Sequence, residues 1–350
     1  MWLAADVGGT KTLVGVFAPG ASRPEPRIVR EYATLDFDSL PDLIETFLDE
    51  TGAGGIQAAA FGVAGPVSGL VARMVNVPWV ADAEPVGDAL HCPVALLNDL
   101  EAMAHAVPVL EPDELATLQE GVTVPTGNAA LIAAGTGLGE ALLHNIDGRF
   151  VPSASEGGHA DFAARTPREL AFVADLSQSL GRVDHDRVIS GPGLVNLFRF
   201  THRGHACKVV DRDADPAALP AQVSESGLWR RCAQCVEALD MFVDAYGAEA
   251  GNLALRSVAT AGVYLGGGIA PKLLPALESG RFLDAFRDKE PLADLLRTAG
   301  VVKSNGEARR LAEQGALVVN GARVSDFTQA VGPGDEIRVG RHRYLRLVAK

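Results

Sequence analysis

Carboxylate and amide side chains follow two short apolar runs of this sequence, at positions where they could do chemistry. Asp6 comes at the end of the run that starts at Leu3, and Asn98 and Asp99 follow the run 94–97. Sites in open α/β sheets gather at the carboxyl ends of strands, so Asp99 is well placed for chemistry. An alternative role for Asp99 is the N-cap of a following helix, and the two roles are compatible. Asp6 could hold Mg²⁺ through water, because Mg²⁺ uses few carboxylates and keeps several waters.

A glycine-rich turn separates Asp6 from the next apolar run, 13–17. This first glycine turn consists of Gly8, Gly9, Thr10 and Lys11. Gly-Gly between two apolar runs predicts a β-hairpin, and consecutive glycine N–H groups can cradle a phosphate. An ordinary hairpin without a ligand is the alternative. The spacing of a Walker loop is absent, and the turn leads into a strand instead of a helix.

The same pattern occurs again in residues 129–144. The second glycine turn stands there between two apolar runs and has the sequence Gly135-Thr136-Gly137-Leu138-Gly139. A third glycine cluster follows the run 258–265 and consists of Gly266, Gly267 and Gly268. Two phosphate-type hairpins in two halves of one chain indicate an internal duplication, with the ligand held between the halves.

Glu156 and His159 are separated by two glycines, which favours a tight loop with both side chains turned the same way. A lone acid or histidine is normally a surface residue or a satisfied core residue. Two ligands do not make a metal site, so a metal contact is the weaker interpretation of this pair.

Six motifs, in this order, resemble those of bacterial glucokinases, which are ATP-dependent hexokinases of the actin-like sugar kinase superfamily. The motifs are DVGGTK (6–11), LLND (96–99), GTGLG (135–139), EGGH (156–159), SGPGLVNL (190–197) and GGGIAP (266–271). The resemblance covers residues 1–290. It implies an α/β chain with the two-lobed, actin-like (ribonuclease H-like) sugar kinase fold, and phosphorylation of glucose at the 6-hydroxyl.

The resemblance also implies roles for individual residues, with Asp99 as the general base. Sugar contacts are implied for Asn98, Asp99, Glu156, His159 and Asp186. ATP contacts are implied for Asp6, Gly8, Gly9, Thr10, Lys11, Gly135, Thr136, Gly137, Gly266, Gly267 and Gly268, with Mg²⁺ near Asp6. Glucokinases usually carry Glu where Asp186 stands. The shorter side chain loses its contact to the anomeric end of the sugar or bridges it through water, so a kinase for a different hexose is an alternative.

Composition limits the protein class. The chain has 350 residues, of which 47% are hydrophobic and 21% charged, enough for two or three domains with a sizeable core. The N-terminus lacks the basic region of a signal peptide, and no apolar run is long enough for a membrane span, so a cytoplasmic protein is expected. The four cysteines, Cys92, Cys207, Cys232 and Cys235, are expected to be buried, reduced thiols, because Cys232-x-x-Cys235 has no second pair or histidine ligands near it in the sequence.

Apolar periodicity predicts the elements that must position these residues. Helices are expected at 39–50, 101–107, 168–180 and 228–255, and buried strands at 58–63 and 94–97. His202, Arg203 and His205 stand in a polar connection and are expected to face solvent.

The C-terminal segment differs from the rest in charge and in resemblance. Residues 291–350 hold 10 Lys/Arg and 6 Asp/Glu, a net charge of +4, whereas residues 1–290 carry −17. LLRTAGVVKSNGEARRLAEQGALVVNGARVSD and GDEIRVGRHRYLRLV, within 292–348, resemble the C-terminal RNA-binding domain of bacterial tyrosyl-tRNA synthetases. Ser304 and Glu307 predict a capping box, and Asn320-Gly321 predicts a hairpin. The implied RNA contacts are Lys303, Arg309, Arg310, Arg341 and Arg343, and a solvated basic surface is the alternative.

The expected domains are a small kinase lobe at 1–109, a large kinase lobe at 110–290 and an α+β RNA-binding-type domain at 292–350. Glucokinases end with a strand and a helix that pack on the first lobe, and residues after 290 lack that pattern. Two functions follow from this: an ATP-dependent glucokinase, a homodimer by family analogy, or an RNA-binding or regulatory protein on an inactive kinase scaffold.

Overall fold

The computed structural model describes most of the chain. The described residues are 1–74, 77–121, 123–211, 215–289, 305–324, 331, 335–340 and 343–346. They form two compact units. Unit 1 comprises Met1–Ala116, Thr123–Asn196 and Leu253–Lys272. Unit 2 takes the described residues of Thr117–Val122, Leu197–Asn252 and Leu273–Lys350. The expected lobes 1–109 and 110–290 and the domain 292–350 stay predictions.

The first sheet of unit 1 has the strand order β3-β2-β1-β4-β8. Its strands are β1 (Trp2–Val7), β2 (Lys11–Ala18), β3 (Glu25–Ala33), β4 (Ala58–Val63) and β8 (Val94–Asn98). The pairs β3–β2 and β2–β1 are antiparallel, whereas β1, β4 and β8 run parallel. Val7 pairs with Val63, and Val63 pairs with Asn98, so the carboxyl ends of three parallel strands meet at one edge.

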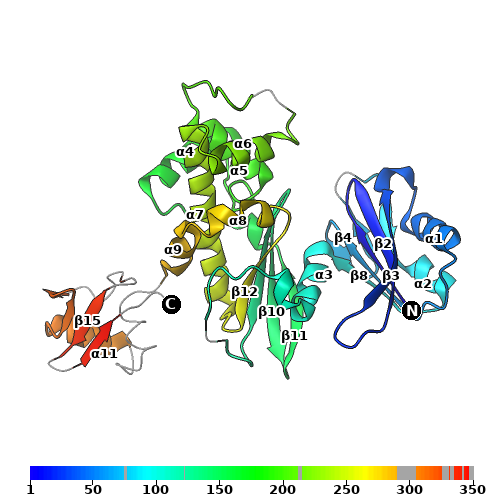
Figure 1. Ribbon diagram of the computed structural model, residues 1–350, viewed down its shortest axis with the longest axis horizontal. Helices are drawn as coiled ribbons and strands as arrows, with labels where there is room; N and C mark the ends of the chain where they lie inside the picture. The colour runs from blue at the N-terminus through cyan, green and yellow to red at the C-terminus, as the bar shows by residue number, and fades with distance from the viewer. Residues whose placement is uncertain are drawn as a thin grey trace. The chain divides into compact units, whose positions relative to one another are not determined.

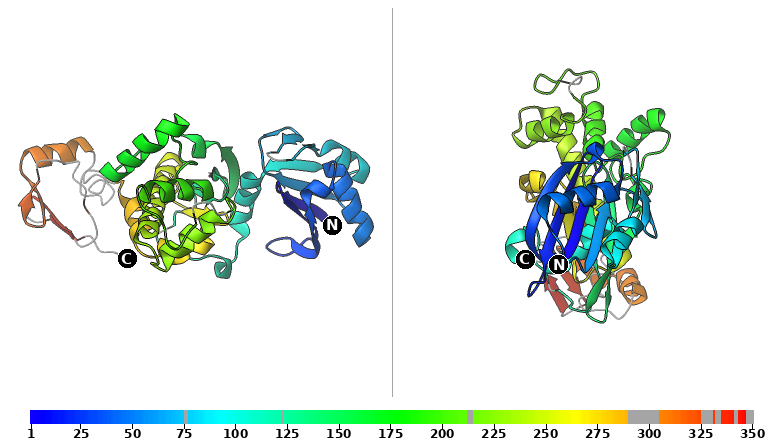
Figure 2. Two further views of the ribbon diagram at one scale, coloured as in Figure 1. Left: turned by 90° about the horizontal axis from the view of Figure 1, so that it is seen from above. Right: turned by 90° about the vertical axis from the view of Figure 1, so that its right-hand side faces the viewer.

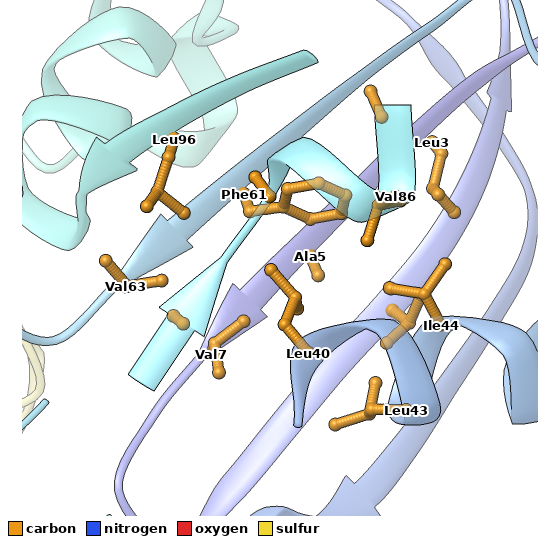
Figure 3. Packing of buried hydrophobic residues seen from close by; sticks show 14 of the residues in the cluster. Leu3, Ala5, Val7, Leu40, Leu43, Ile44, Phe61, Val63, Val86 and Leu96 are labelled. Carbon is orange, nitrogen blue, oxygen red and sulfur yellow. The ribbon is translucent and has the colours of Figure 1, made fainter. Parts of the chain in front are cut away.

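Helix α1 (Leu40–Thr51) covers a face of this sheet (Figure 3). The Ser39 side chain caps it by accepting the Asp42 N–H at 3.2 Å, and Gly52 ends it with a φ of 64°. Leu40, Leu43, Ile44 and Phe47 of the helix are buried against β1 and β4. Burial of each such side chain contributes about 1.5–3 kcal/mol. The helix expected at 39–50 is confirmed within one residue.

Short elements complete this part of unit 1. A three-stranded sheet is formed by β5 (Val67–Ser68), β6 (Val71–Arg73) and β7 (Val80–Asp82). It is followed by α2 (Glu84–Leu90), and the short 3₁₀ segments of this part of unit 1 are η1 (Thr34–Asp36), η2 (Val107–Val109) and η3 (Pro112–Glu114).

The second sheet repeats the arrangement of the first. Its order is β11-β10-β9-β12, formed by β9 (Ala129–Ala134), β10 (Leu138–Ile146), β11 (Arg149–Ser155) and β12 (Gly262–Gly266). In both sheets, a hairpin of two antiparallel strands lies beside a strand parallel to its first member. The two glycine turns are the loops of these two hairpins, as the internal duplication predicts.

Helix α3 (Asp99–Ala106) continues from β8 and packs on the second sheet. Leu100 and Ala104 share a core with Leu131 and Ala133 of β9. A Cβ on Gly139 would lie 2.9 Å from a Leu100 methyl carbon, so the missing side chain lets the helix approach the second hairpin closely. The helix begins two residues earlier than expected.

Two further helices follow, of which α4 belongs to unit 1 and α5 continues from unit 1 into unit 2. Helix α4 (Pro167–Leu180) starts with a reciprocal capping box between Thr166 and Glu169, and confirms the helix expected at 168–180. The 3₁₀ turn η4 (Gly157–His159) precedes it, and α5 (Gly191–Thr201) follows it.

Unit 2 is mainly helical, with α6 (Leu219–Leu228), α7 (Ala233–Ser257), η5 (Pro271–Leu273), α8 (Leu274–Leu277) and α9 (Arg281–Arg287). Figure 1 shows the long helix α7 beside α8 and α9. Gly247 permits this packing, because a Cβ there would lie 2.2 Å from the Phe282 carbonyl oxygen. The expected single helix from Leu228 to Leu255 is wrong. The chain turns at Arg230, which has a φ of 52°, and α7 begins only at Ala233.

Two expectations about side chains of unit 2 are also wrong. His202 is 0% exposed, because it is packed against Phe198 with ring centroids 4.2 Å apart, although Arg203 and His205 face solvent as expected. Cys232-x-x-Cys235 does have a histidine nearby, since the fold brings His202 to it from α5. All four cysteines are unpaired, but only Cys235 is fully buried.

The C-terminal segment has a core of its own. Its elements are α11 (Asn305–Glu313), β13 (Leu317–Val319), β14 (Ala322–Arg323), β15 (Glu336–Val339) and β16 (Arg343–Arg346). The antiparallel order is β14-β13-β15-β16, and α11 lies against the sheet (Figure 2). Asn320 and Gly321, with φ of 51° and 83°, form the expected hairpin turn. Lys303, Ser304 and Arg341, and the side chain of Arg343, lie outside the described residues.

A search of the described helices finds none with both the length and the apolar character required to cross a bilayer.

Candidate active site

Asn98 and Asp99 lie where β8 passes into α3. Asn98 is the N-cap, because its Oδ1 accepts the Leu100 N–H at 3.0 Å and its Nδ2 donates to the Gly65 carbonyl at 3.2 Å. Asp99 is the first helical residue, and its Oδ1 also accepts the Leu100 N–H, at 2.8 Å. The capping role considered for Asp99 therefore belongs to Asn98. The Asp99 carboxylate stays accessible to solvent at a helix N-terminus.

Asp6 and Asp99 influence one another electrostatically across the first sheet. Partial enclosure by protein raises the pKa of Asp99, the Leu100 N–H bond opposes this shift, and the negative charge of Asp6 adds to it. Enclosure also raises the pKa of Asp6, and the ammonium group of Lys11 opposes that rise. Two carboxylates at one strand edge thus lie where a cation would relieve their repulsion.

The first glycine turn is held from behind by Thr34. The Thr34 hydroxyl donates to the Gly8 carbonyl at 2.8 Å, and its N–H donates to the Thr10 carbonyl at 3.0 Å. The Gly8 N–H donates to the Lys11 carbonyl at 3.0 Å. Thr34 is fully buried, and its oxygen also accepts the Thr12 hydroxyl at 2.9 Å, since its own proton is used on Gly8. These bonds engage three carbonyl groups of the turn.

Lys11 lies on the exposed side of the same hairpin. Its ammonium group is 3.0 Å from a carboxylate oxygen of Glu31, and both side chains are more than half exposed. In this structure Lys11 is therefore paired with β3.

The second glycine turn is held by Asp186 and the start of α5. The Asp186 Oδ1 accepts the Leu138 N–H at 2.7 Å, and the Gly191 N–H donates to the Gly135 carbonyl at 2.9 Å. A Cβ on Gly137 would lie 2.8 Å from the same carboxylate oxygen. Asp186, predicted as a sugar contact, thus has one oxygen committed to the second glycine turn, next to exposed Thr136.

Glu156 and His159 lie on one turn, which we call the 155–159 loop. The His159 Nε2 is 3.9 Å from a Glu156 carboxylate oxygen, so both side chains point the same way. The loop abuts the second glycine turn, because a Cβ on Gly158 would lie 2.1 Å from the Leu138 carbonyl oxygen. The Asp186 N–H donates to the Gly158 carbonyl at 2.8 Å, which joins the loop to Asp186.

Asp184 is a site residue that the sequence interpretation missed. Its Oδ2 is 3.6 Å from His159 Nδ1, opposite Glu156, and its side chain is only 14% exposed. The backbone pairing of Asp161 with Asp184 holds it there, and the Arg182 guanidinium donates to the His159 carbonyl. The signal available in the sequence was the alternation of Asp184 and Asp186 two residues apart, which puts both on one side of an extended segment.

The third glycine cluster has two tightly packed glycines and one open one. A Cβ on Gly266 would lie 2.6 Å from the Met103 sulfur, and a Cβ on Gly267 would lie 2.4 Å from the Ala134 carbonyl oxygen. Gly267 also has a φ of 80°. A Cβ on Gly268 would meet no atom within 4 Å. The first two glycines thus let β12 fit against its neighbours, and Gly268 is the open position.

All predicted sugar and ATP residues belong to unit 1. They fall into two groups. Asp6 and Asp99 are linked by their charges, and hydrogen bonds join Asp186 both to the 155–159 loop and to the second glycine turn. Leu100, next to Asp99, packs on Gly139 of the second turn and links the groups.

Comparisons with known proteins match this chain to two families. Residues 3–303 match the family model Glucokinase, and residues 282–346 match the model of the tyrosine–tRNA ligase SYY-like C-terminal domain. Glucokinases of a Synechocystis sp. and a Nostoc sp. are 33% and 35% identical, over 86% and 84% of this chain, and both matches cover 92% of the relative.

Solved structures show the same fold. A glucokinase from an Antarctic psychrotroph has a TM-score of 0.74 and 26% identity, over 84% of this chain and 90% of that one. A ROK family glucokinase from Streptomyces griseus, in complex with glucose and AMPPNP, has a TM-score of 0.53 and 20% identity, over 81% of this chain and 86% of that one.

Proposed function

Since this chain belongs to the glucokinase family and phosphorylates glucose, we propose a role in that reaction for each group of site residues. Asp99 accepts the proton of the glucose 6-hydroxyl while that oxygen attacks the γ-phosphate of ATP. The observation that carries this assignment is the position of Asp99: an accessible carboxylate at the meeting edge of three parallel strands, with a raised pKa. A general base works best when its pKa lies close to the working pH.

Phosphoryl transfer requires positioning and charge neutralisation more than covalent chemistry. The carbonyls of Gly8, Thr10 and Lys11 and the N–H of Gly8 are bonded within the fold. The amide groups of Gly9 and Thr10 and the Thr10 hydroxyl would therefore meet the phosphate oxygens. The second turn would contact the phosphates through Thr136 and its glycines.

Mg²⁺ fits beside Asp6, because the repulsion between Asp6 and Asp99 marks a place where positive charge is stabilising. When bound, the ion would neutralise the charge of the phosphates. Asp6 would hold it, and Asp99 would remain available for the proton.

The other hydroxyls of glucose are held by the 155–159 loop, Asp186 and Asn98. Glu156 and His159 offer adjacent polar groups, and Asp184 positions the His159 ring from its other side. Asp186 uses one oxygen for the Leu138 N–H and has the other for the sugar. The Glu156 and His159 side chains are more than half exposed in this structure. Polar groups matched to each hydroxyl reject a sugar that lacks one when the bound sugar excludes water from them.

The adenosine of ATP approaches the backbone at Gly268, the open glycine of its cluster. Gly266 and Gly267 contribute by packing, since any side chain there would meet β9 or α3.

A coupled assay of ATP-dependent sugar phosphorylation tests this proposal on wild type and Asp99→Asn. We expect turnover with glucose and ATP, and a loss of about 10²–10⁴-fold in the variant. Mannose, fructose and N-acetylglucosamine test the alternative of a different hexose. Asp88→Asn is the matched control, because Asp88 is an exposed residue of α2. Variant turnover within threefold of wild type would remove Asp99 from the role of base.

A second function, RNA binding, is proposed for the C-terminal segment. It is supported by the family match of residues 282–346 and by two arginines that face solvent on α11. Arg309 lies 3.0 Å from Glu313 on the same helix, and Arg310 is exposed beside it. Such a pair can contact phosphates without reading sequence.

The homodimer remains a proposal from family analogy, and analytical ultracentrifugation tests it.

A further inference from the structure

Four metal-binding side chains converge in unit 2, away from the residues assigned to glucose and ATP. They are His202, Cys207, Cys232 and Cys235, and their ligand atoms all lie within 4.8 Å of one another. The side chains come from three places in the sequence: the residue after α5, the loop that follows it, and the start of α7. Convergence from three separate segments requires the fold, which is why the spacing of the cysteines alone did not predict it.

The distances in the cluster fit a tetrahedron of ligands around one ion. His202 Nε2 lies 3.3 Å from Cys232 Sγ and 3.9 Å from Cys235 Sγ, and Cys207 Sγ lies 4.0 Å from Cys235 Sγ. Zinc bonds of ~2.3 Å to sulfur and ~2.0 Å to nitrogen place two sulfurs roughly 3.8 Å apart, and a nitrogen and a sulfur roughly 3.5 Å apart. A disulfide would instead need sulfurs at ~2.05 Å.

The histidine is oriented for metal binding by its backbone contact. His202 Nδ1 lies 2.9 Å from the Phe198 carbonyl oxygen, which can only accept a hydrogen bond. The ring proton is therefore on Nδ1, and the lone pair of Nε2 is directed at the sulfurs. A backbone carbonyl on the second ring nitrogen is the usual outer contact of a histidine that binds a metal.

The surroundings of the cysteines also suit the binding of a metal ion. The Val210 N–H donates to Cys207 Sγ at 3.3 Å, a contact that favours a thiolate. His202 and Cys235 are fully buried, whereas Cys207 and Cys232 are partly exposed, which provides a route for an ion.

We propose that His202, Cys207, Cys232 and Cys235 bind one zinc ion in a structural site. Four protein ligands leave no open position for a substrate or water, which distinguishes such a site from a catalytic one. Three sulfurs and one imidazole select a soft or borderline ion, so the site rejects the Mg²⁺ that accompanies ATP. The ion ties the end of α5 to the beginning of α7 and fixes the loop that carries Cys207.

The first test measures zinc in the untagged full-length protein, purified under reducing conditions and exposed to one equivalent of Zn²⁺. We expect about one zinc per chain by plasma mass spectrometry after gel filtration. Cys232→Ser and Cys235→Ser should each lose most of it. Cys92→Ser is the matched control, because Cys92 lies in unit 1, outside the cluster, and should keep the full zinc content. Wild-type protein that leaves gel filtration without zinc would overturn the proposal.

The second test uses Co²⁺ in the wild-type protein and so does not depend on whether a variant folds. We expect the visible absorption of tetrahedral cobalt and a near-ultraviolet thiolate-to-metal band. His202→Cys should keep the metal with a shifted cobalt spectrum, and His202→Ala should bind it more weakly. A cobalt spectrum without thiolate bands, or a Cys207–Cys235 disulfide found by mass spectrometry in freshly purified reduced protein, would contradict the site.

Discussion

Asp99 shows how three local influences on one carboxyl group combine. Enclosure by protein and the charge of Asp6 raise its pKa, while the Leu100 N–H lowers it, and the net shift is upward. The sequence predicted the location of this group, because an apolar run followed by Asn-Asp is visible without a structure. It did not predict the electrostatic influence of Asp6, which requires the register between β1, β4 and β8.

The raised pKa of Asp99 predicts a pH dependence with a definite sign. Folded protein binds this proton more tightly than the unfolded chain, so the group stabilises the fold at low pH, and this contribution is lost as pH rises through the raised pKa. At pH 7, Asp99→Asn should therefore unfold in urea with a free energy equal to or above that of wild type. The acid limb of kcat/KM, which reports the free enzyme, should likewise lie above the ordinary pKa of an aspartate. Clear destabilisation of the variant at pH 7 would contradict this, with Asp88→Asn as the control.

Asp184 is predicted to act through His159. Asp184→Asn removes the negative charge 3.6 Å from the imidazole and leaves a group of similar size. We expect a rise of about 2–5-fold in KM for glucose, with little change in KM for ATP, because a partly exposed ion pair contributes roughly 0.2–1 kcal/mol. Steady-state kinetics with each substrate varied separates the two. Asp147→Asn is the control, since Asp147 lies in an exposed turn with a φ of 51° that Asn also adopts. An equal rise in both KM values would indicate a general structural effect.

At the scale of elements, helices with strong end signals were predictable and those broken by a backbone turn were not. Helix α1 has Ser39 at its start, Gly52 at its end and one apolar face, and all three signals are local. The break before α7 depends on the positive φ of Arg230. An arginine in the sequence does not predict such a conformation. The hydrogen bonds from Thr34 to the first glycine turn were also missed, because Thr34 is distant in sequence from Gly8.

The Thr34→Val variant tests these hydrogen bonds, because it keeps the shape of the side chain and removes its hydroxyl. The Gly8 carbonyl and the Thr12 hydroxyl would then lose their partner inside the fold. We expect the free energy of unfolding to fall by ~1–3 kcal/mol, and KM for ATP to rise because the turn is less fixed. Urea denaturation and kinetics measure the two effects. Thr123→Val, at an exposed position, should change neither. An unchanged free energy of unfolding in Thr34→Val would show that the hydrogen bonds of the Thr34 hydroxyl do not contribute to stability.

At the scale of the whole molecule, two unrelated family signals meet in one chain. The two family matches overlap at residues 282–303, and the charge changes sign near the same place. Composition and motif order predict a division of the chain near residue 290, which stays a prediction. The zinc ligands of unit 2 were not predictable in this way, since no single segment contains more than two of them.

The C-terminal segment is predicted to bind structured RNA weakly through phosphate contacts. A gel-shift titration of the full chain with transfer RNA should show affinity that falls by roughly 0.7–0.9 log units per log salt for each phosphate contacted. Arg309→Glu with Arg310→Glu should weaken binding to any RNA sequence, and the same double variant should keep the glucose turnover of wild type. The matched control is Arg27→Glu with Arg30→Glu, two exposed arginines of β3. Absence of binding at low salt would leave the segment without an RNA role.

The core of the C-terminal segment has a consequence for how this protein can change during evolution. The buried residues described for it all fall between Ala308 and Val339, in one continuous stretch of the sequence. The second sheet of unit 1 is built differently, because β12 pairs with β9 from a point more than a hundred residues away. One recombination event between genes can therefore transfer the C-terminal module whole. An exchange of the second sheet must instead carry the whole span from β9 to β12, together with the helices between them.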